Sequence, residues 1–523
     1  MTIYNEELIS EREAIAAFER EVGVSGLRSE VALIGNRQFL KFTVGRESPL
    51  YTYALLASQQ SLQADNPFRG AIGLSLQKIE QFPASIEANA LLTLLTRSTR
   101  EVSQGTAPRG YTIPYVPFQK REDHQLAQPA SHIVRGRRGV GKSTLIRRAM
   151  ELLAQTPAIV ANLDMQTYST LSGEELIREV LRDACESLAD AADRGKGAGN
   201  SELVRQFRDI VTGIDSGTLN VARAPASIKR ALSRFTEANS VNAFLFLDDF
   251  HLVDQENQPK LLHTLHAAMK GANGWLKVAG LSSLLNPYSP KTRQGLQVPG
   301  DAQFISLDLT LTNPEAAEKH LRAILEGFLT AVGYSLNRTV IPDAAFRRLV
   351  WANAGVPRDF LQMFGRALEH SQRNRHAAVT VSDVNIAIGE VGQQKMDDLQ
   401  RDARNEAGVL REMLAKLEEL CLDEQKGNAF LVRTEDSRER ALVQILSDLR
   451  MLHLIHQSIT PHKAGERFEA YILDYSLFTG FRRRPNIAEM VPVELQFKAS
   501  ELRALPRVQA GFFIGDSGEV GSN

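Results

Sequence analysis

The chain has 523 residues, of which 43% are apolar and 24% are charged. This length exceeds one ordinary hydrophobic core, so we expect two to four soluble domains. Lysine plus arginine (61) nearly balances aspartate plus glutamate (62), which excludes a chain-wide positive field for nucleic acid. The two cysteines lie far apart, which argues against a disulfide framework and against a zinc site.

No segment offers about 18 uninterrupted apolar residues, so no membrane partner is expected. The N-terminal stretch MTIYNEELISEREA is polar and acidic, unlike a signal sequence. A cytoplasmic location is therefore the default expectation.

Residues 1–110 are predicted to form an accessory domain. A charged helical stretch opens it, the alternating sequence EVALIGNRQFLKFTV indicates strands, and ASIEANALLTLLTRSTREV indicates a helix. No cluster of chemically active residues stands out. We expect this domain to contact a partner protein or further copies of the chain. The following Gly- and Pro-rich sequence GTAPRGYTIPYVPFQKRED predicts a boundary near residue 110.

The strongest signal is a phosphate-loop pattern, Gly-x4-Gly-Lys-Ser, at residues 136–143. A short apolar strand at 132–134 precedes it, and a helical period follows. Glycines let successive N–H groups point into one concavity that fits a phosphate. Lys142 would reach the outer phosphates of ATP, and the Ser143 hydroxyl would ligate Mg²⁺. The residues predicted to bind the nucleotide are Gly136, Arg137, Arg138, Gly139, Val140, Gly141, Lys142, Ser143 and Thr144.

Just upstream, Phe118 and the charged residues Arg121, Glu122 and Asp123 could contact the adenine. The alternative is a solvated charge cluster.

A second strand is predicted at 159–163, followed by helices at 172–192 and 201–214. The buried strand at 243–247 ends in Asp248 and Asp249, at the edge where open α/β sheets bind ligands. Asp248 would hold Mg²⁺, and Asp249 would orient or deprotonate the attacking water. The alternative is a pair of helix-capping aspartates.

After a helix near 255–273, a fourth strand is predicted at 275–283, ending in Ser282 and Ser283. If it lies between the two motif strands, one of these serines could hydrogen-bond the attacking water or the terminal phosphate; an ordinary turn is the alternative. The next loop carries Arg293, either an arginine finger for a neighbouring subunit or a solvated side chain. A fifth strand is predicted at 304–309.

Four helices are predicted from residue 313 onward, as a small bundle. Between the second and third, Gly355 can end one helix, and Pro357 with Arg358 can start the next. An arginine in that first turn could meet the γ-phosphate; alternatively it only pairs with Asp359 or Glu369.

The C-terminal part predicts two amphipathic helices and two strands, HLIHQSI and FEAYILDY, which is the order of a winged-helix domain. The second helix has a mixed rather than a basic face. The hairpin tip offers His462, Lys463 and Arg467, and a basic run, Arg482 to Arg484, follows. These could contact DNA phosphates, or the domain could dock a protein.

Taken together, GRRGVGKST, LFLDDF, GLSS, GVPRDF and the C-terminal helices and hairpin resemble AAA+ ATPases of the initiator clade (the origin-recognition-complex type) and the related STAND ATPases. The resemblance covers about residues 115–480. It implies Walker A at 136–143, Walker B at Asp248 and Asp249, sensor 1 at Ser282 or Ser283, and sensor 2 at Arg358. Many AAA+ motors carry Glu at the position of Asp249, so the shorter Asp suggests slow turnover. Bacterial ATPases of similar architecture resemble components of phage-defence operons.

The expected fold is α/β: a P-loop parallel-sheet AAA+ core (111–311), a helical lid (312–395), a C-terminal winged-helix domain with tail (396–523) and an extra N-terminal α/β domain (1–110). The expected function is that of an ATPase switch, dependent on ATP and Mg²⁺, which engages duplex DNA or a partner protein and forms oligomers. The alternative is a nucleotide-gated scaffold with negligible hydrolysis.

Overall fold

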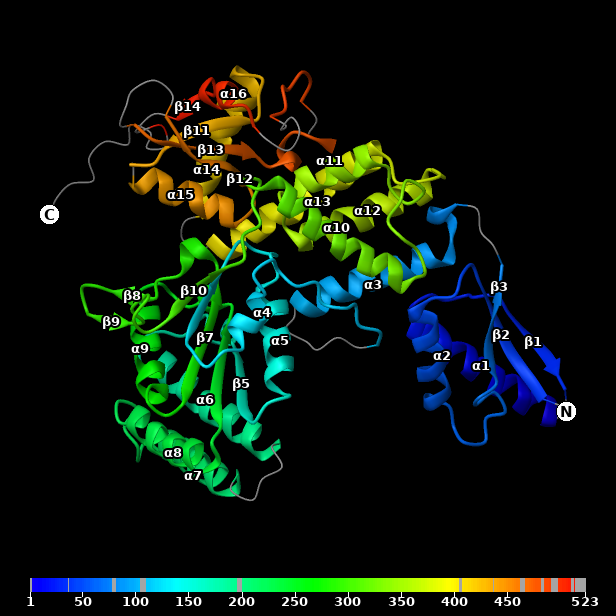
Figure 1. The fold of residues 1–523 in the computed structure, drawn as a ribbon, viewed down its shortest axis with the longest axis horizontal. Helices are drawn as coiled ribbons and strands as arrows, with labels where there is room; N and C mark the ends of the chain where they lie inside the picture. The colour runs from blue at the N-terminus through cyan, green and yellow to red at the C-terminus, as the bar shows by residue number, and fades with distance from the viewer. Residues whose placement is uncertain are drawn as a thin grey trace.

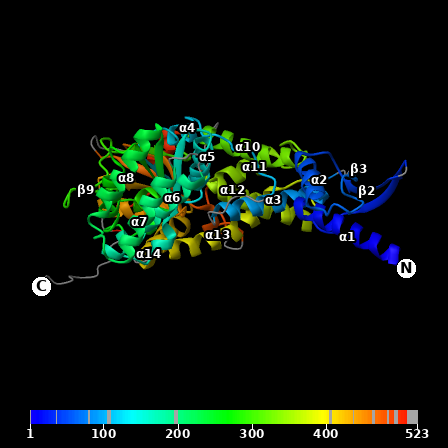
Figure 2. The same ribbon diagram turned by 90° about the horizontal axis from the view of Figure 1, so that it is seen from below.

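The computed structural model describes residues 2–35, 37–77, 81–103, 110–194, 200–403, 407–435, 437–460, 466–480, 484–490, 497–508 and 512. The molecule is elongated, with the N-terminal domain at one end and helix α3 (Ile86–Ser103) leading to the rest (Figures 1 and 2). The helices drawn in yellow-green lie in the middle, between that domain and the parallel sheet with its helices (Figure 1). None of the helices in the described ranges combines the length and the apolar character that a membrane span needs.

The core sheet has five parallel strands in the order β10-β4-β7-β6-β5. The strands are β4 (His132–Arg135), β5 (Ala158–Asp164), β6 (Asn242–Asp248), β7 (Gly274–Gly280) and β10 (Gln303–Ser306). All five predicted strands are present, and β7 lies between β4 and β6 as the sensor hypothesis requires. Because the strands are parallel, their carboxyl ends meet at one edge of the sheet. The phosphate loop follows β4 at this edge, and Asp248 is the last residue of β6.

Strand β6 explains why this sheet carries helices on both faces. Leu245 and Leu247 pack into the cluster formed with helices α6 to α9, while Phe244 and Phe246 pack into the cluster formed with α5. All four side chains are fully buried. The helices of the core are α4 (Glu122–Leu126), α5 (Lys142–Leu153), α6 (Gly173–Arg194), α7 (Asn200–Asp215), α8 (Ala224–Asn239) and α9 (Gln258–Met269). Helix α8 was not predicted. A small hairpin, β8 (Tyr288–Ser289) and β9 (Gln294–Gly295), follows β7.

The end of β7 differs from the prediction. The strand stops at Gly280, and Ser282 and Ser283 lie in the 3-10 turn Ser282–Leu284. A Cβ atom at Gly280 would lie 2.6 Å from Cδ2 of Leu285 and 3.2 Å from the main-chain nitrogen of His251. The position is therefore crowded and suits a glycine, and the apolar pattern alone does not reveal that the strand ends here.

The four predicted helices of the lid are present as α10 (Pro314–Ala331), α11 (Asp343–Asn353), α12 (Pro357–Arg373) and α13 (Val381–Ala403). Between α11 and α12, Gly355 has φ +84°, and a Cβ there would lie 2.1 Å from the carbonyl oxygen of Leu309. Ala354, with φ +50°, and Gly355 are therefore both left-handed where α11 ends, and Pro357 starts α12 as predicted. Helix α13 runs without a break across residue 395, the predicted boundary between lid and C-terminal domain.

The N-terminal domain packs two helices on a three-stranded sheet, and Phe18 stacks on Phe42 with ring centroids 4.2 Å apart. Its elements are α1 (Thr2–Val22), β1 (Ser29–Ile34), β2 (Arg37–Val44), α2 (Pro49–Ser61) and β3 (Ile72–Leu76). Helix α3 leaves this domain and packs against α12, where Nε2 of Gln372 donates to Oδ1 of Asn89 at 2.9 Å. The N-terminal domain is thus attached to the lid.

The C-terminal domain contains the two predicted helices and the predicted antiparallel hairpin. Its elements are α14 (Ala407–Glu418), β11 (Ala429–Arg433), α15 (Ser437–Asp448), β12 (Leu452–Ile459), β13 (Phe468–Leu473), α16 (Ala499–Arg503) and β14 (Arg507–Val508), in the sheet order β12-β13-β11-β14. Strands β11 and β14 were not predicted. His462, Lys463, Arg482 and Arg483 lie outside the described residues. Arg484 forms an ion pair with Asp423.

Candidate nucleotide site

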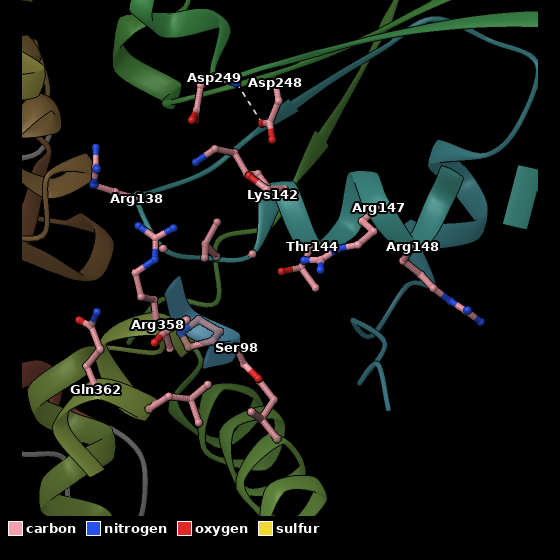
Figure 3. Close-up of a pocket in the computed structure, with 18 of the residues that line it drawn as sticks. Ser98, Arg138, Lys142, Thr144, Arg147, Arg148, Asp248, Asp249, Arg358 and Gln362 are labelled. Atoms are coloured by element: carbon pink, nitrogen blue, oxygen red, sulfur yellow. Dashed lines mark hydrogen bonds between the residues drawn. The ribbon is translucent and has the colours of Figure 1, made fainter. Parts of the chain in front are cut away.

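The phosphate loop follows β4 and enters α5, as the motif predicts. Gly139 and Gly141 adopt left-handed backbone angles, with φ +77° and +107°. Lys142 is the first residue of α5, and its Nζ donates to the carbonyl oxygens of Gly136 (2.9 Å) and Arg137 (3.0 Å). The ammonium group is therefore held in the loop itself, below the carboxylates at the end of β6 (Figure 3). Burial lowers the pKa of Lys142, and the nearby Asp249 and Asp248 oppose that shift.

The two predicted acids lie where β6 ends. The N–H of Asp249 donates to Oδ1 of Asp248 at 2.9 Å, and Asp249 has φ +51° (Figure 3). Burial, then the neighbouring charge of Asp249, raises the pKa of Asp248 to about 6, while a hydrogen bond from the Ser143 side chain acts in the opposite direction. The structure thus brings Lys142, Ser143, Asp248 and Asp249 together from two strands about 105 residues apart.

The donor set fits a phosphate-bound magnesium ion. The residues that the structure describes contain no group of three or more His, Cys, Asp and Glu side chains able to hold a metal by themselves. Ser143 and Asp248 supply one hydroxyl and one carboxylate, already in hydrogen-bond contact. Mg²⁺ is usually bound by one or two such protein oxygens, with phosphates and water completing the shell. These two residues therefore suit a metal that arrives with a triphosphate.

A cavity of about 960 Å³ opens in front of the loop, which is ample for a nucleotide. Its walls come from the core, the lid, helix α3 and the C-terminal domain. The site residues that line it are Arg138, Gly139, Val140, Gly141, Lys142, Ser143, Thr144, Asp248, Asp249 and Arg358.

The lid arginine reaches this cavity. Figure 3 shows Arg358 extending from the start of α12 toward the phosphate loop and Arg138. Burial, then the positive charges of Arg450 and Arg138, lowers the pKa of Arg358 to about 10. The alternative pairing predicted from the sequence is wrong: Asp359 is bonded to Lys395 and Arg450, and Glu369 is bonded to Arg366 and Arg373. Crowded guanidinium groups beside a phosphate loop favour an anionic ligand.

An aromatic and apolar wall lies beside the loop on the lid side. Phe118 stacks on His320 with ring centroids 4.8 Å apart. Tyr115, Ile324, Phe328 and Leu361 extend the wall. The sequence suggested Phe118 as a possible adenine contact. Ile324, Phe328 and Leu361 were missed because they come from the distant lid helices, and Tyr115, three residues before Phe118, was missed as well. Arg121, Glu122 and Asp123 do not line the cavity. Nε of Arg121 lies 3.5 Å from Oδ1 of Asp123, so these two side chains pair with each other.

Gly136 and Arg137 belong to the phosphate loop but do not line the cavity. The Arg137 side chain is buried and donates to the carbonyl oxygens of Leu309 (3.0 Å) and Ala354 (2.9 Å). The main-chain N–H of Arg137 donates to Oδ1 of Asp308 at 2.9 Å. This arginine therefore joins the loop to the start of the lid.

Two predicted catalytic residues lie outside the cavity wall. Ser282 lies in the turn after β7, and the N–H of its neighbour Ser283 donates to Oδ2 of Asp448 at 2.6 Å. Arg293 is exposed on the hairpin of β8 and β9, which projects from the side of the core (Figure 1). Within one chain, neither residue belongs to the group that surrounds the loop.

Several site residues from the C-terminal half had no sequence signal. Arg450 lines the cavity and forms ion pairs with Asp359 and Asp398. Asp398 in turn lies 3.3 Å from Nε of Arg138 in the phosphate loop. On the core side, His251 lines the cavity with Nδ1 3.9 Å from Oδ1 of Asp249. The contacts of Arg450 and Asp398 join residues that lie 52 to 260 positions apart in the sequence (Arg450 to Asp398, and Asp398 to Arg138), so no local sequence pattern predicts them.

The chain is similar to one protein family and to several solved structures. Residues 121–273 match the sequence model of the family described as "AAA ATPase domain". No curated protein matches the chain. Among solved structures, the Aeropyrum pernix ORC2 protein, in ADPNP-ADP complexes, is similar at 14% identity and a TM-score of 0.38, over 72% of this chain and 94% of that one.

Drosophila ORC bound to DNA is similar at 14% identity and a TM-score of 0.36, over 76% of this chain and 93% of that one. Cdc6p from Pyrobaculum aerophilum is similar at 15% identity and a TM-score of 0.34, over 70% and 93%. The family match, together with a phosphate loop and paired acids on a five-stranded parallel sheet, identifies an AAA ATPase domain in residues 121–273 of this chain.

Proposed function

We propose that this chain binds Mg-ATP in the cavity in front of the phosphate loop, hydrolyses it slowly, and uses the nucleotide state as a conformational switch. The observation that carries this proposal is the convergence of Lys142, Ser143, Asp248, Asp249 and Arg358 on one cavity. Four of these residues come from the two motifs of the core sheet and one from the lid, so a triphosphate there would contact both parts.

Each residue has a role in the proposed reaction. Lys142 exchanges its bonds with loop carbonyls for bonds with the β- and γ-phosphates, and Arg358 neutralises charge on the γ-phosphate. Asp249 orients a water for in-line attack and accepts its proton. When bound, Mg²⁺ supplies charge neutralisation at the phosphate oxygens, and Ser143 and Asp248 are the residues that would hold it.

The test is ATP binding and phosphate release by the full chain. Wild type should bind ATP with Mg²⁺ and release phosphate slowly, Lys142→Ala should do neither, and Asp249→Asn should bind without release. A wild type that binds ATP but releases no phosphate, with or without duplex DNA, would favour the nucleotide-gated scaffold instead. A wild type that ignores ATP would overturn the proposal.

A protein partner is the second candidate for what the switch engages, and the surface of α15 favours it over DNA. In a winged-helix domain this helix would read the major groove. Among the described side chains of α15, Ala441 and Gln444 are the exposed ones, while Arg440 donates to Oε1 of Glu469 at 2.7 Å. Arg440 is thus the one cation among the described side chains of α15, and it is already paired with a carboxylate, which leaves it poorly suited to phosphate contacts. Salt-dependent binding of duplex DNA would favour DNA; its absence would favour protein.

The exposed position of Arg293 supports the proposal that it acts on a neighbouring subunit's nucleotide. Arg293→Ala should then lower ATPase activity only under conditions where the chain forms oligomers. A role in phage defence or DNA maintenance is proposed on the resemblance of the motifs alone. Phage plating on cells with wild type or Lys142→Ala would test it.

A further inference from the structure

The C-terminal domain contacts the nucleotide site through the last residue of α15. The carbonyl oxygen of Asp448 accepts a hydrogen bond from the N–H of Arg138 in the phosphate loop at 3.0 Å. Its carboxylate accepts a hydrogen bond from the N–H of Ser283, in the turn after β7, at 2.6 Å. Asp448 is only 6% exposed. One residue of a third domain therefore holds two loops of the ATPase core.

The turn that follows Asp448 is strained in a way that points to function. The N–H of Arg450 donates to the carbonyl oxygen of Ser447, and that of Met451 to Leu446, which is the hydrogen-bond pattern of a helix end normally built on glycine. Here the left-handed position, with φ +68°, is occupied by Arg450. A non-glycine residue in that conformation costs about 1 kcal/mol or more. Strain of this kind is tolerated where the side chain is needed.

The Arg450 side chain explains why an arginine stands there. It is 2% exposed and forms ion pairs with Asp359, the residue after Arg358, and with Asp398, 2.6 Å away. Asp398 also lies 3.3 Å from Arg138. Arg450 of the C-terminal domain is thus linked to the Arg138 guanidinium through the carboxylate of Asp398, and to the first turn of α12, which carries Arg358, through Asp359.

We propose that the turn Asp448 to Arg450 is a positioning element of the nucleotide site, in which Asp448 holds the turn after β7 for hydrolysis, and Arg450 holds Arg138 and the first turn of α12, which carries Arg358, for nucleotide binding. The inference rests on the proposed ATPase function and adds to it the domain that controls it. Because coupling is reciprocal, a bound nucleotide strengthens the docking of the C-terminal domain by the same factor as docking strengthens nucleotide binding.

The first test separates turnover from binding at Asp448. Asp448→Ala should lower kcat about tenfold, because the turn after β7 loses its charged acceptor, while the Kd of a fluorescent ATP analogue stays within about twofold. Asp448→Asn should recover most of the rate, since its side-chain oxygen still accepts from Ser283. Gln444→Ala, one turn earlier on the exposed face of α15, is the matched control and should behave as wild type.

The second test addresses Arg450. Arg450→Gly relieves the backbone strain but removes the ion pairs, so the Kd for the ATP analogue should rise about tenfold. Arg375→Gly is the matched control, because Arg375 also has a left-handed backbone, φ +56°, and is exposed away from the cavity. Its Kd should not change.

Thermal unfolding and gel filtration establish whether each variant is folded. If Asp448→Ala is not folded, the Kd of Arg450→Gly decides. Unchanged kcat in Asp448→Ala together with unchanged Kd in Arg450→Gly would overturn the inference. If wild type binds ATP without hydrolysing it, the hydrolysis step of the proposed function is wrong. The inference about Arg450 is then still decided by the Kd of Arg450→Gly for the ATP analogue.

Discussion

The main-chain N–H of Arg358, in the first turn of the lid helix α12, donates to the carbonyl oxygen of Gly139 in the phosphate loop at 3.3 Å. The lid is therefore seated directly on the loop that is proposed to hold the phosphates. A change in the position of the loop is transmitted to α12 through this contact, and from α12 to helix α3 of the N-terminal domain, which packs on it.

Arg358→Ala should weaken ATP binding by about tenfold or more, because the γ-phosphate loses its contact with a buried guanidinium group. Arg358→Lys should restore only part of the affinity, since an ammonium group cannot form the forked contact of a guanidinium group. The Kd values for ATP and ADP measure the effect, and the loss should be larger for ATP. Equal losses for the two nucleotides would contradict a contact with the γ-phosphate.

Gly139→Ala should disturb the seat of the lid. A Cβ there would lie 3.0 Å from Cβ of Arg358 and 3.1 Å from Cγ1 of Val356, at a position with φ +77°. Gly173→Ala is the matched control, with φ +59° and no atom within 4 Å of the added Cβ. Both variants carry backbone strain of about 1 kcal/mol, but only Gly139→Ala should also lower ATP affinity. Equal ATP affinities in the two variants would show that the contact between lid and loop does not matter for binding.

Asp249 should determine the rate of hydrolysis rather than the affinity for ATP. Asp249→Asn keeps the shape of the side chain and removes the proton acceptor, so phosphate release should fall by about a hundredfold with little change in Kd. Asp249→Glu extends the carboxylate toward the phosphates and should retain activity that Asp249→Asn loses. Single-turnover phosphate release measures the difference. Full activity in Asp249→Asn would remove Asp249 from the mechanism.

The sequence predicted the parts of the site that are local motifs. Lys142 follows glycines directly, and Asp248 ends a buried strand, so backbone geometry and strand polarity bring them together. The position of β7 between β4 and β6 was only a condition of the sensor hypothesis, and the structure meets it. Ser282 was placed at a strand end because the apolar pattern continues past Gly280, where the chain turns instead. His320 and Asp448 were missed, since a stack on Phe118 or a bond to Ser283 depends on how whole domains dock.

Asp448 should make the stability of the protein fall as the pH rises from about 4 to about 6. Burial, followed by the negative charge of Asp308, raises the pKa of Asp448 from 3.8 to about 6, while Ser283 and Lys142 oppose the shift. The folded state then binds the proton more tightly than the unfolded state. Below the unfolded pKa both states are protonated and no penalty exists; above the folded pKa the cost of the buried charge is fully present.

Asp448→Asn removes this charge, so it should be more stable than wild type at pH 7, by roughly 1–3 kcal/mol, and equal to it near pH 4. The difference in thermal midpoint between variant and wild type, followed from pH 4 to 7, isolates Asp448 from Asp248, which both proteins retain. Asp301→Asn is the control: a hydrogen bond from Lys270 lowers the pKa of Asp301, so its contribution is lost only as the pH falls below about 4. The difference in thermal midpoint between Asp301→Asn and wild type should therefore stay constant from pH 4 to 7. A constant difference for Asp448→Asn as well would show that the Asp448 carboxyl titrates normally.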